Sequence, residues 1–258
     1  MPPSQRFKSD IAWSTETNIT VHGMDLCRDI LGKISLSDMA FLQITGRLPS
    51  KSESHAFEAL SITLVEHGLT PSALVARMTL AGAPEAMQAA VAAGLNGLGS
   101  VFVGSMEGAA KLLQEALAQT TQTTDLEALA DEIVQRARAK KQAIPGIGHH
   151  MHKPQDPRAI RLFEIAQEDG LSGRYVALMN AMAESASQAL GKSLPVNATG
   201  AIAAIASELH IPWNLVRGIG VYARAIGLVG HIAEELKQPL ARKAKQAIES
   251  EALAHHRQ

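Results

Sequence analysis

Three histidines lie close together in one short segment, AIPGIGHHMHKPQD, which covers residues 143–156. His149, His150 and His152 share this segment with two glycines and two prolines. Glycine and proline favour a loop, and loops carry function more often than helix interiors do. Histidine is the side chain whose ordinary pKa suits proton transfer near neutrality. The segment is therefore the first candidate for acid–base chemistry.

A candidate carboxylate-binding group follows this loop. Asp156 and Pro157 predict a helix start, which places Arg158 in the first turn. Backbone N–H groups at such a turn attract anions, and an arginine adds a bidentate clamp for a carboxylate. A proton carrier beside this clamp would suit chemistry on a small polyacid. Two alternatives stay open for the histidines: a metal site, although no Cys or Glu accompanies them at a ligand spacing, and solvated loop residues.

A second set of chemical groups lies near the C-terminus, in GIGVYARAIGLVGHIAEEL. Arg224 and His231 are seven residues apart, so a helix would present them on one face. An arginine among Ala, Ile and Gly requires an anionic partner, which favours ligand binding over an ordinary surface charge. His231 is interpreted as a core histidine that is hydrogen-bonded to Glu234 or Glu235.

Two further segments hold isolated polar groups in apolar surroundings. Glu107 is the single acid in GSVFVGSMEGAAKLL, where burial could make it an acid or base near neutrality. The alternative is a carboxylate that is stabilised by a helix N-terminus. Asn197 and Thr199 directly precede a very apolar helix, so they are candidates for catalysis and equally for capping that helix.

The elements that position these groups are predicted to be helices. Apolar residues recur at steps of three and four through most of the chain, and no run alternates over more than a few residues. Thr70-Pro71, Asp125 and Asp156-Pro157 are expected to begin helices, whereas Gly68, Gly170 and Gly191 are expected to stop them. The almost uncharged stretch at 89–106 is interpreted as a buried helix and loop. The predicted fold class is all-α.

Composition excludes several classes of protein. The 258 residues are 46% hydrophobic and carry a formal charge of −1, so the chain is a folded protein without the basic surface that nucleic acids need. The N-terminus has no apolar segment typical of a signal peptide, and the stretch at 89–106 lacks the Leu, Ile and Phe content and the basic flanks of a membrane span. Cys27 is the only cysteine, which favours a reducing compartment. We therefore expect a cytoplasmic protein with no nucleic-acid or membrane partner.

Taken together, these motifs resemble the citrate synthase superfamily. GIGHHMHKPQDPRA is similar to the family segment G-x-G-H-R-x-Y-K-x-x-D-P-R-A, and YARAIGLVGHIAEEL is similar to A-R-x-x-G-W-x-A-H-x-x-E. LQITGRLPSKSE resembles the early element L-x-x-G-E-L-P-T-x-x-E. The similarity runs in the family's order from about Ile19 to Ala241. It implies a two-domain helical subunit, a homodimer and coenzyme A thioester substrates, with no permanently bound cofactor and no metal.

The resemblance also implies roles for individual residues. His149 matches the family histidine that exchanges a proton with the oxygen on the oxaloacetate-derived carbon. Arg158 and Arg224 match arginines that clamp carboxylates, and His150 and Lys153 are expected to contribute to substrate binding as well. The large domain is expected to comprise residues 1–108 and 211–258. Residues 109–210 would form a small domain that closes over the ligand, as lids commonly do.

Three positions depart from the family pattern. Glu107 stands where the family has the histidine of G-P-L-H-G-G-A, and Thr199 stands where N-V-D places the catalytic aspartate. The late family Arg-Pro pair is Gln238-Pro239 in this chain. Threonine cannot alone remove a methyl proton from acetyl-CoA, which ordinary condensation requires. Cleavage needs different help: Glu107 could protonate the enolate or donate a hydrogen bond to it, and Asn197 could supply a neutral donor.

These departures resemble the short citryl-CoA lyases. The predicted function is a carbon–carbon lyase that cleaves citryl-CoA, or a related 3-hydroxy-3-carboxyacyl-CoA, to an acyl-CoA (acetyl-CoA) and a 2-oxo acid (oxaloacetate). His149, Glu107, Asn197 and Thr199 would be catalytic. Two alternatives remain: a small citrate or 2-methylcitrate synthase, and a catalytically inactive member that binds a coenzyme A thioester. A purely structural helical scaffold is disfavoured because it would not need arginines in such settings.

Overall fold

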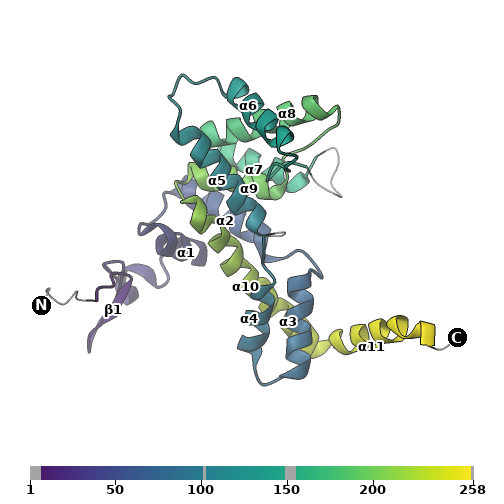
Figure 1. The fold of residues 1–258 in the computed structure, drawn as a ribbon. Coiled ribbons are helices and arrows are strands. Elements are labelled where there is room, and N and C mark those ends of the chain that lie inside the picture. The colour runs from purple at the N-terminus through teal and green to yellow at the C-terminus, as the bar shows by residue number, and fades with distance from the viewer. Residues whose placement is uncertain (1–6, 101–102, 149–154, 257–258) are drawn as a thin grey trace, which may run out of the picture.

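The computed structural model describes residues 7–100, 103–148 and 155–256 and has the all-α fold that the sequence predicts. In Figure 1 the helices form an upper group and a lower pair that one long helix connects, and the N-terminal and C-terminal segments extend outward. The α-helices are α1 (Leu36–Thr45), α2 (Lys51–Val65), α3 (Pro71–Gly82), α4 (Met87–Asn96), α5 (Gly104–Ala118), α6 (Leu126–Ala139), α7 (Pro157–Glu168), α8 (Arg174–Leu190), α9 (Ala198–Glu208), α10 (Trp213–Lys237) and α11 (Ala241–Ala252).

Local capping chemistry sets the helix starts where the sequence predicts them. Thr70 caps α3 with proline at the first helical position, and Asp125 accepts hydrogen bonds from the backbone N–H groups of Glu127 and Ala128 at the start of α6. Gly191 ends α8 in the left-handed conformation, in which a side chain would be strained. These signals are local, so they could be read from neighbouring residues alone.

The N-terminal region contains a small sheet that the sequence pattern did not reveal. Strands β1 (Ala12–Ser14), β2 (Ile19–Val21) and β3 (Met24–Asp25) pair antiparallel in that order. Each strand has two or three residues, and β1 is exposed throughout. Such short strands provide no alternating pattern long enough to recognise. In Figure 1 this sheet projects from the purple end of the chain, away from the helices.

The core is built around α9. Nearly every residue of α9 is buried, and α5, α7 and α8 pack around it while α6 packs on α8. These helices form the upper group in Figure 1. Alanine and glycine make up much of α9, and side chains this small let the surrounding helices approach closely. The close approach provides the core that a chain with few aromatic residues requires.

The long helix α10 connects the two ends of the molecule. It packs along α2, α3, α4 and α5, and Figure 1 shows it running from the upper group down to the α3–α4 pair. Among the described residues, α10 is the one helix that is long and apolar enough to cross a membrane by length and composition. Half of that window is buried inside the protein, as expected for a core helix.

The alanine-rich segment at 89–106 is less buried than the sequence analysis expected. Of the ten residues of α4, Ala90 and Gly94 are buried, and Met87 is 44% exposed. Alanine contributes little apolar area, so one buried face suffices to hold this helix on its neighbours. The prediction of a helix was correct, but that of a fully buried one was wrong.

Candidate active site

A cavity of about 390 Å³ lies where α2, α3, α5, α7, α9 and α10 meet. This size is within the range of small-molecule sites. Side chains from widely separated parts of the sequence line it, including Arg158, Arg224, Asn197 and Thr199. The cavity therefore brings together four of the residues that the sequence analysis selected.

Arg224 forms a cationic part of the cavity wall. It lies on α10, is 8% exposed, and its Nε donates a hydrogen bond to the carbonyl oxygen of Leu64 at 3.2 Å. Among the described residues, no carboxylate lies within ion-pair distance of its guanidinium group. Burial lowers the pKa of Arg224, and the nearby charge of Glu66 offsets part of that effect. A buried cation at a cavity wall is a ready partner for an anionic ligand.

Arg158 is oriented by a buried carboxylate. Asp156, which is 1% exposed, caps α7 and pairs with the Arg158 guanidinium, with Nη2 and Oδ2 2.9 Å apart. The same carboxylate accepts the backbone N–H of Ala198 at 3.0 Å. Burial by itself would raise the pKa of Asp156, but these hydrogen bonds outweigh it and hold that pKa below its ordinary value. Asp156 thus fixes Arg158 to the start of α9.

Close backbone packing holds the first part of the histidine loop. A methyl group at Gly146 would lie 2.6 Å from the Cα atom of Gly200, so only glycine permits this contact. Gly148 donates its N–H to the carbonyl of Pro195 at 2.7 Å, and Asn197 donates its own to Gly146 at 2.9 Å. Both loop glycines have positive φ angles. The loop is therefore fixed to the start of α9 as far as Gly148, which lines the cavity.

The histidines themselves fall outside the described residues. His149, His150, His152 and Lys153 belong to residues 149–154, so their predicted roles stay predictions. Among the residues that the structure does describe, no three His, Cys, Asp or Glu side chains are grouped closely enough to hold a metal ion.

Asn197 and Thr199 line the cavity and also organise the start of α9. Asn197 accepts hydrogen bonds from the Gly200 N–H and the Thr199 hydroxyl, at 3.1 and 2.7 Å, and its amide donates to the Gly148 carbonyl at 2.7 Å. The capping that the sequence analysis weighed as an alternative for both residues is thus present for Asn197, whereas the Thr199 hydroxyl bonds to the Asn197 side chain. Because the Thr199 hydroxyl already donates to Asn197, its oxygen faces a ligand chiefly as an acceptor.

Glu107 lies in a different setting from the one its sequence neighbours suggested. Its carboxylate pairs with Arg217 of α10, with Oε2 2.5 Å from Nε, and it does not belong to the described cavity lining. Glu107 is therefore not an isolated acid among apolar groups, and it lies in the first turn of α5, where the alternative interpretation of a carboxylate at a helix N-terminus places it. Ser105, two residues earlier at the start of α5, lines the cavity instead.

The segment between α2 and α3 supplies a wall that the sequence analysis did not select. Thr63, Leu64, His67 and Thr70 all line the cavity. The sequence analysis treated the adjacent Gly68 as a helix stop and gave His67 no functional role. The sequence did contain a signal for this wall, because His67 stands in a short loop between two capped helices. A histidine in a loop was the reason for selecting residues 149–152 as candidates for acid–base chemistry.

Comparison with known families agrees with this architecture. The model of the family domain "Citrate synthase, C-terminal domain" matches residues 14–245, which is most of the chain. The chain belongs to the citrate synthase family. Curated members include the citrate synthase of Heyndrickxia coagulans, 28% identical over 209 residues, which cover 80% of this chain and 53% of that protein. The citrate/2-methylcitrate synthase of Bacillus subtilis (strain 168) is 28% identical over 208 residues, with 80% and 54% covered.

Among solved structures of this family fold, citryl-CoA lyase from Hydrogenobacter thermophilus superposes with a TM-score of 0.82 at 32% identity. The match covers 90% of this chain and 88% of that one. ATP citrate lyase from Methanothrix soehngenii, solved with citrate and coenzyme A, gives a TM-score of 0.74 at 21% identity and shares the fold over 92% of this chain and 40% of its own. The chain spans about half the length of the curated synthases it matches.

Proposed function

We propose that this member of the citrate synthase family is a carbon–carbon lyase that acts on citryl-CoA or a related 3-hydroxy-3-carboxyacyl-CoA. Its products would be an acyl-CoA, acetyl-CoA for citryl-CoA, and a 2-oxo acid such as oxaloacetate. The observation that supports this most directly is the presence of Arg158 and Arg224 on one cavity. A substrate with two carboxylates could be held between them. The solved citryl-CoA lyase, similar in both fold and chain length, favours the same reaction class.

The proposed reaction is a reverse aldol-type cleavage. A base takes the proton of the tertiary hydroxyl group, and the resulting C–O⁻ becomes the ketone of the 2-oxo acid. The electrons of the broken C–C bond pass to the thioester carbonyl and form an enolate, whose carbon then takes up a proton to give the acyl-CoA. His149 is the proposed base, and it follows directly on the anchored, cavity-lining Gly148.

Position 199 bears on the proton at the enolate carbon in both directions of the reaction. Condensation removes this proton from acetyl-CoA and cleavage returns a proton to the same carbon, so by microscopic reversibility each direction needs an acid–base group there, and Thr199 is not one. Position 199 therefore does not distinguish cleavage from condensation. Glu107 could serve as the proton donor in this scheme only after separating from Arg217, whereas Asn197 already lines the cavity with an amide group.

A second candidate function is a small synthase that joins an acyl-CoA to a 2-oxo acid. The curated relatives, which are citrate and 2-methylcitrate synthases, favour it. The two candidates differ in whether cleavage or condensation proceeds at a useful rate. Assays of citryl-CoA cleavage and of condensation with oxaloacetate, run on the same preparation, would separate them.

The central test removes each arginine in turn. Arg158→Met and Arg224→Met keep much of the side-chain length but remove the charge, so each should lower kcat/KM for citryl-CoA by about 100-fold or more. Arg161→Met is the matched control, because Arg161 lies one turn further along α7 and pairs with Glu164 and Glu168 at the surface. Oxaloacetate release, coupled to its reduction, provides the assay.

The outcomes distinguish the candidate functions. The lyase is supported if the natural chain cleaves citryl-CoA, both cavity variants lose this activity and Arg161→Met retains it. Turnover limited to condensation would favour the synthase. Tight calorimetric binding of acetyl-CoA without turnover in either direction would identify an inactive thioester-binding protein. Equal activity in Arg224→Met and Arg161→Met would refute the assignment of this cavity as the substrate site.

We also propose that the protein is a homodimer. One face of α10 exposes Leu215, Ile226 and Val229 to between 42% and 47%. A second copy packed on this face would cover it. Sedimentation should give a dimer that Ile226→Lys combined with Val229→Lys converts to a monomer, whereas Leu190→Lys at the end of α8 should not. A stable monomer of the natural chain at working concentration would contradict this proposal.

The predicted division into domains would give the cavity a lid. Arg224 lies on α10, in the proposed large domain, and Arg158 lies on α7, in the proposed small domain of residues 109–210. A ligand that engages both would favour a closed arrangement. Small-angle scattering with and without citrate would detect a decrease in the radius of gyration if the two parts close.

A further inference from the structure

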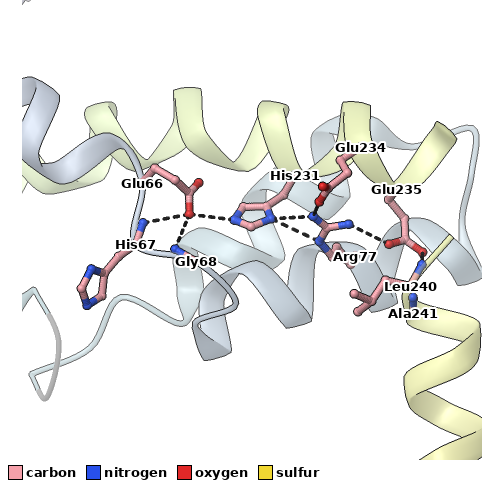
Figure 2. Close-up of polar contacts among 9 residues, drawn as sticks. All are labelled: Glu66, His67, Gly68, Arg77, His231, Glu234, Glu235, Leu240 and Ala241. Carbon is pink, nitrogen blue, oxygen red and sulfur yellow. Dashed lines mark hydrogen bonds and ion pairs between the residues drawn. The ribbon is translucent and has the colours of Figure 1, made fainter. Parts of the chain in front are cut away.

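A chain of polar groups, buried at Arg77 and His231, connects α3 and α10 to the cavity wall (Figure 2). Arg77 of α3, 1% exposed, donates to Nδ1 of His231 from Nη2 at 2.8 Å and from Nε at 3.2 Å. His231, 8% exposed, contacts Oε1 of Glu66 through Nε2 at 3.0 Å. The same Glu66 oxygen accepts the backbone N–H groups of His67 and Gly68 at 2.8 and 2.6 Å. This chain of hydrogen bonds therefore ends at the backbone of His67, which lines the cavity.

The partners fix the direction of each hydrogen bond in this chain. An arginine can only donate, so Nδ1 of His231 must be the acceptor and the ring proton must lie on Nε2. Nε2 then donates to Glu66. The hydrogen bonds between Arg77, the imidazole ring and Glu66 consequently run in one direction, and the His67 and Gly68 N–H groups donate to Glu66 from the other side.

Opposite charges hold Arg77 itself in place. It pairs with Glu234 and, through Nη1, with Glu235 at 3.0 Å. Burial alone would lower the pKa of Arg77, but the two carboxylates outweigh it and raise that pKa, so the cation persists at any working pH. Arg77, the donor at the start of this chain of hydrogen bonds, is thus permanently charged.

The loop between α2 and α3 is also held on α10 by contacts that lie one to two turns before His231. Arg224 donates to the Leu64 carbonyl, and the Val65 carbonyl packs directly against Gly227, where no side chain would fit. Arg224, Gly227 and His231 occupy one face of α10. The stretch from Leu64 to Gly68 is thereby fixed at three points along this face.

We propose that Arg77, His231 and Glu66 are positioning residues that hold the loop carrying His67 at its place in the cavity wall. The inference rests on the proposed function for the identity of the cavity as the substrate site. None of the three residues belongs to the cavity lining, so they act through the backbone of the loop. Glu66 works as a three-fold acceptor, and its negative charge is not what the loop requires.

Glu66 is the position to vary, since its side chain is 48% exposed and the fold does not depend on it as it does on buried Arg77. Glu66→Gln keeps an oxygen that can accept all three hydrogen bonds, whereas Glu66→Ala removes the acceptor. The matched control is Glu53→Ala at the other end of α2, where the carboxylate accepts the Ser50 N–H and pairs with Arg47. His231→Gln and His231→Leu repeat the comparison in the middle of the chain.

Two measurements are made on each variant: amide hydrogen exchange of the peptide covering residues 62–70, and kcat and KM for citryl-CoA. In Glu66→Ala and His231→Leu we expect faster exchange and a KM raised roughly five- to tenfold, with kcat within about twofold of the natural chain. The glutamine variants and Glu53→Ala should match the natural chain in both measurements.

Unchanged exchange and KM in Glu66→Ala would overturn the inference, as would a Glu66→Gln variant as impaired as Glu66→Ala. The exchange measurement requires no substrate. If the natural chain fails to cleave citryl-CoA, the proposed function fails, and the exchange pattern by itself still decides whether the chain of hydrogen bonds positions the loop.

Discussion

Gly227 offers a sharp test of how the cavity wall is held. A methyl group added there would lie 3.0 Å from the carbonyl carbon of Val65, overlap its oxygen, and lie 3.3 Å from Oε2 of Glu66. Carbon atoms in contact rest about 3.5–4.0 Å apart, so the contact with the carbonyl carbon alone would move the loop away from α10 by about 0.5–1 Å, and the overlap with the closer oxygen requires a larger movement. The Gly227→Ala substitution therefore displaces the loop at a defined point.

The displacement should lower the free energy of unfolding and, separately, weaken substrate binding. Overpacking of this kind destabilises by about 1–3 kcal/mol. The Arg224 to Leu64 hydrogen bond, already 3.2 Å long, would stretch beyond a useful length, at a further cost of about 1 kcal/mol. We expect a total loss of roughly 2–4 kcal/mol and a KM for citryl-CoA raised about tenfold.

Gly230→Ala is the control on the same helix, because a methyl group at Gly230 would meet no atom within 4 Å. Alanine is the better helix former, so this variant should be as stable as the natural chain or up to about 1 kcal/mol more stable. Urea unfolding and steady-state kinetics on both variants give the comparison. A Gly227→Ala protein with the natural stability and KM would refute the tight packing of the loop on α10.

Two further predictions concern other parts of the molecule. Gly200→Ala would place a methyl group 3.0 Å from the carbonyl carbon of Gly146, so we expect displacement of the histidine loop and a fall in kcat of about tenfold or more, with thermal unfolding followed as a control for folding. Arg47 and hydrogen bonds from Ser50 outweigh burial and lower the pKa of Glu53 to about 2. Because the folded-state pKa is depressed, the stabilisation by Glu53 is fully present above its unfolded pKa and disappears as pH falls towards 2. Glu53→Gln should therefore lower the free energy of unfolding at pH 7 by about 1 kcal/mol and by less at pH 3, and an equal loss at both would contradict the assignment.

Helix positions were predictable because their signals lie next to one another in the chain. Thr70, Asp125 and Asp156 cap helices through backbone N–H groups two or three residues away. Arg224 was selected as a lone cation among apolar helix residues, and the structure places it in the cavity wall. Arg77, in the run ALVARMTLAG, presents the same signal and was overlooked.

What the sequence did not reveal depends on contacts between distant residues. Glu107 meets Arg217 across 110 positions, and no local pattern connects the two. His231 was expected to bond with Glu234 or Glu235, its helix neighbours, but it bonds with Arg77 and Glu66 from α3 and the end of α2. In both cases the type of residue was informative, whereas the partner was decided by helix packing.

The placement of the two cavity arginines on separate helices has a consequence for ligands. Arg158 is tied through Asp156 to the start of α9, and Arg224 is tied to the α2–α3 loop. A dianion that binds both arginines would link these two parts of the molecule. Two monoanions of the same total charge would neutralise the arginines without linking them. Citrate or oxaloacetate should therefore raise the melting temperature far more than acetate at equal carboxylate concentration.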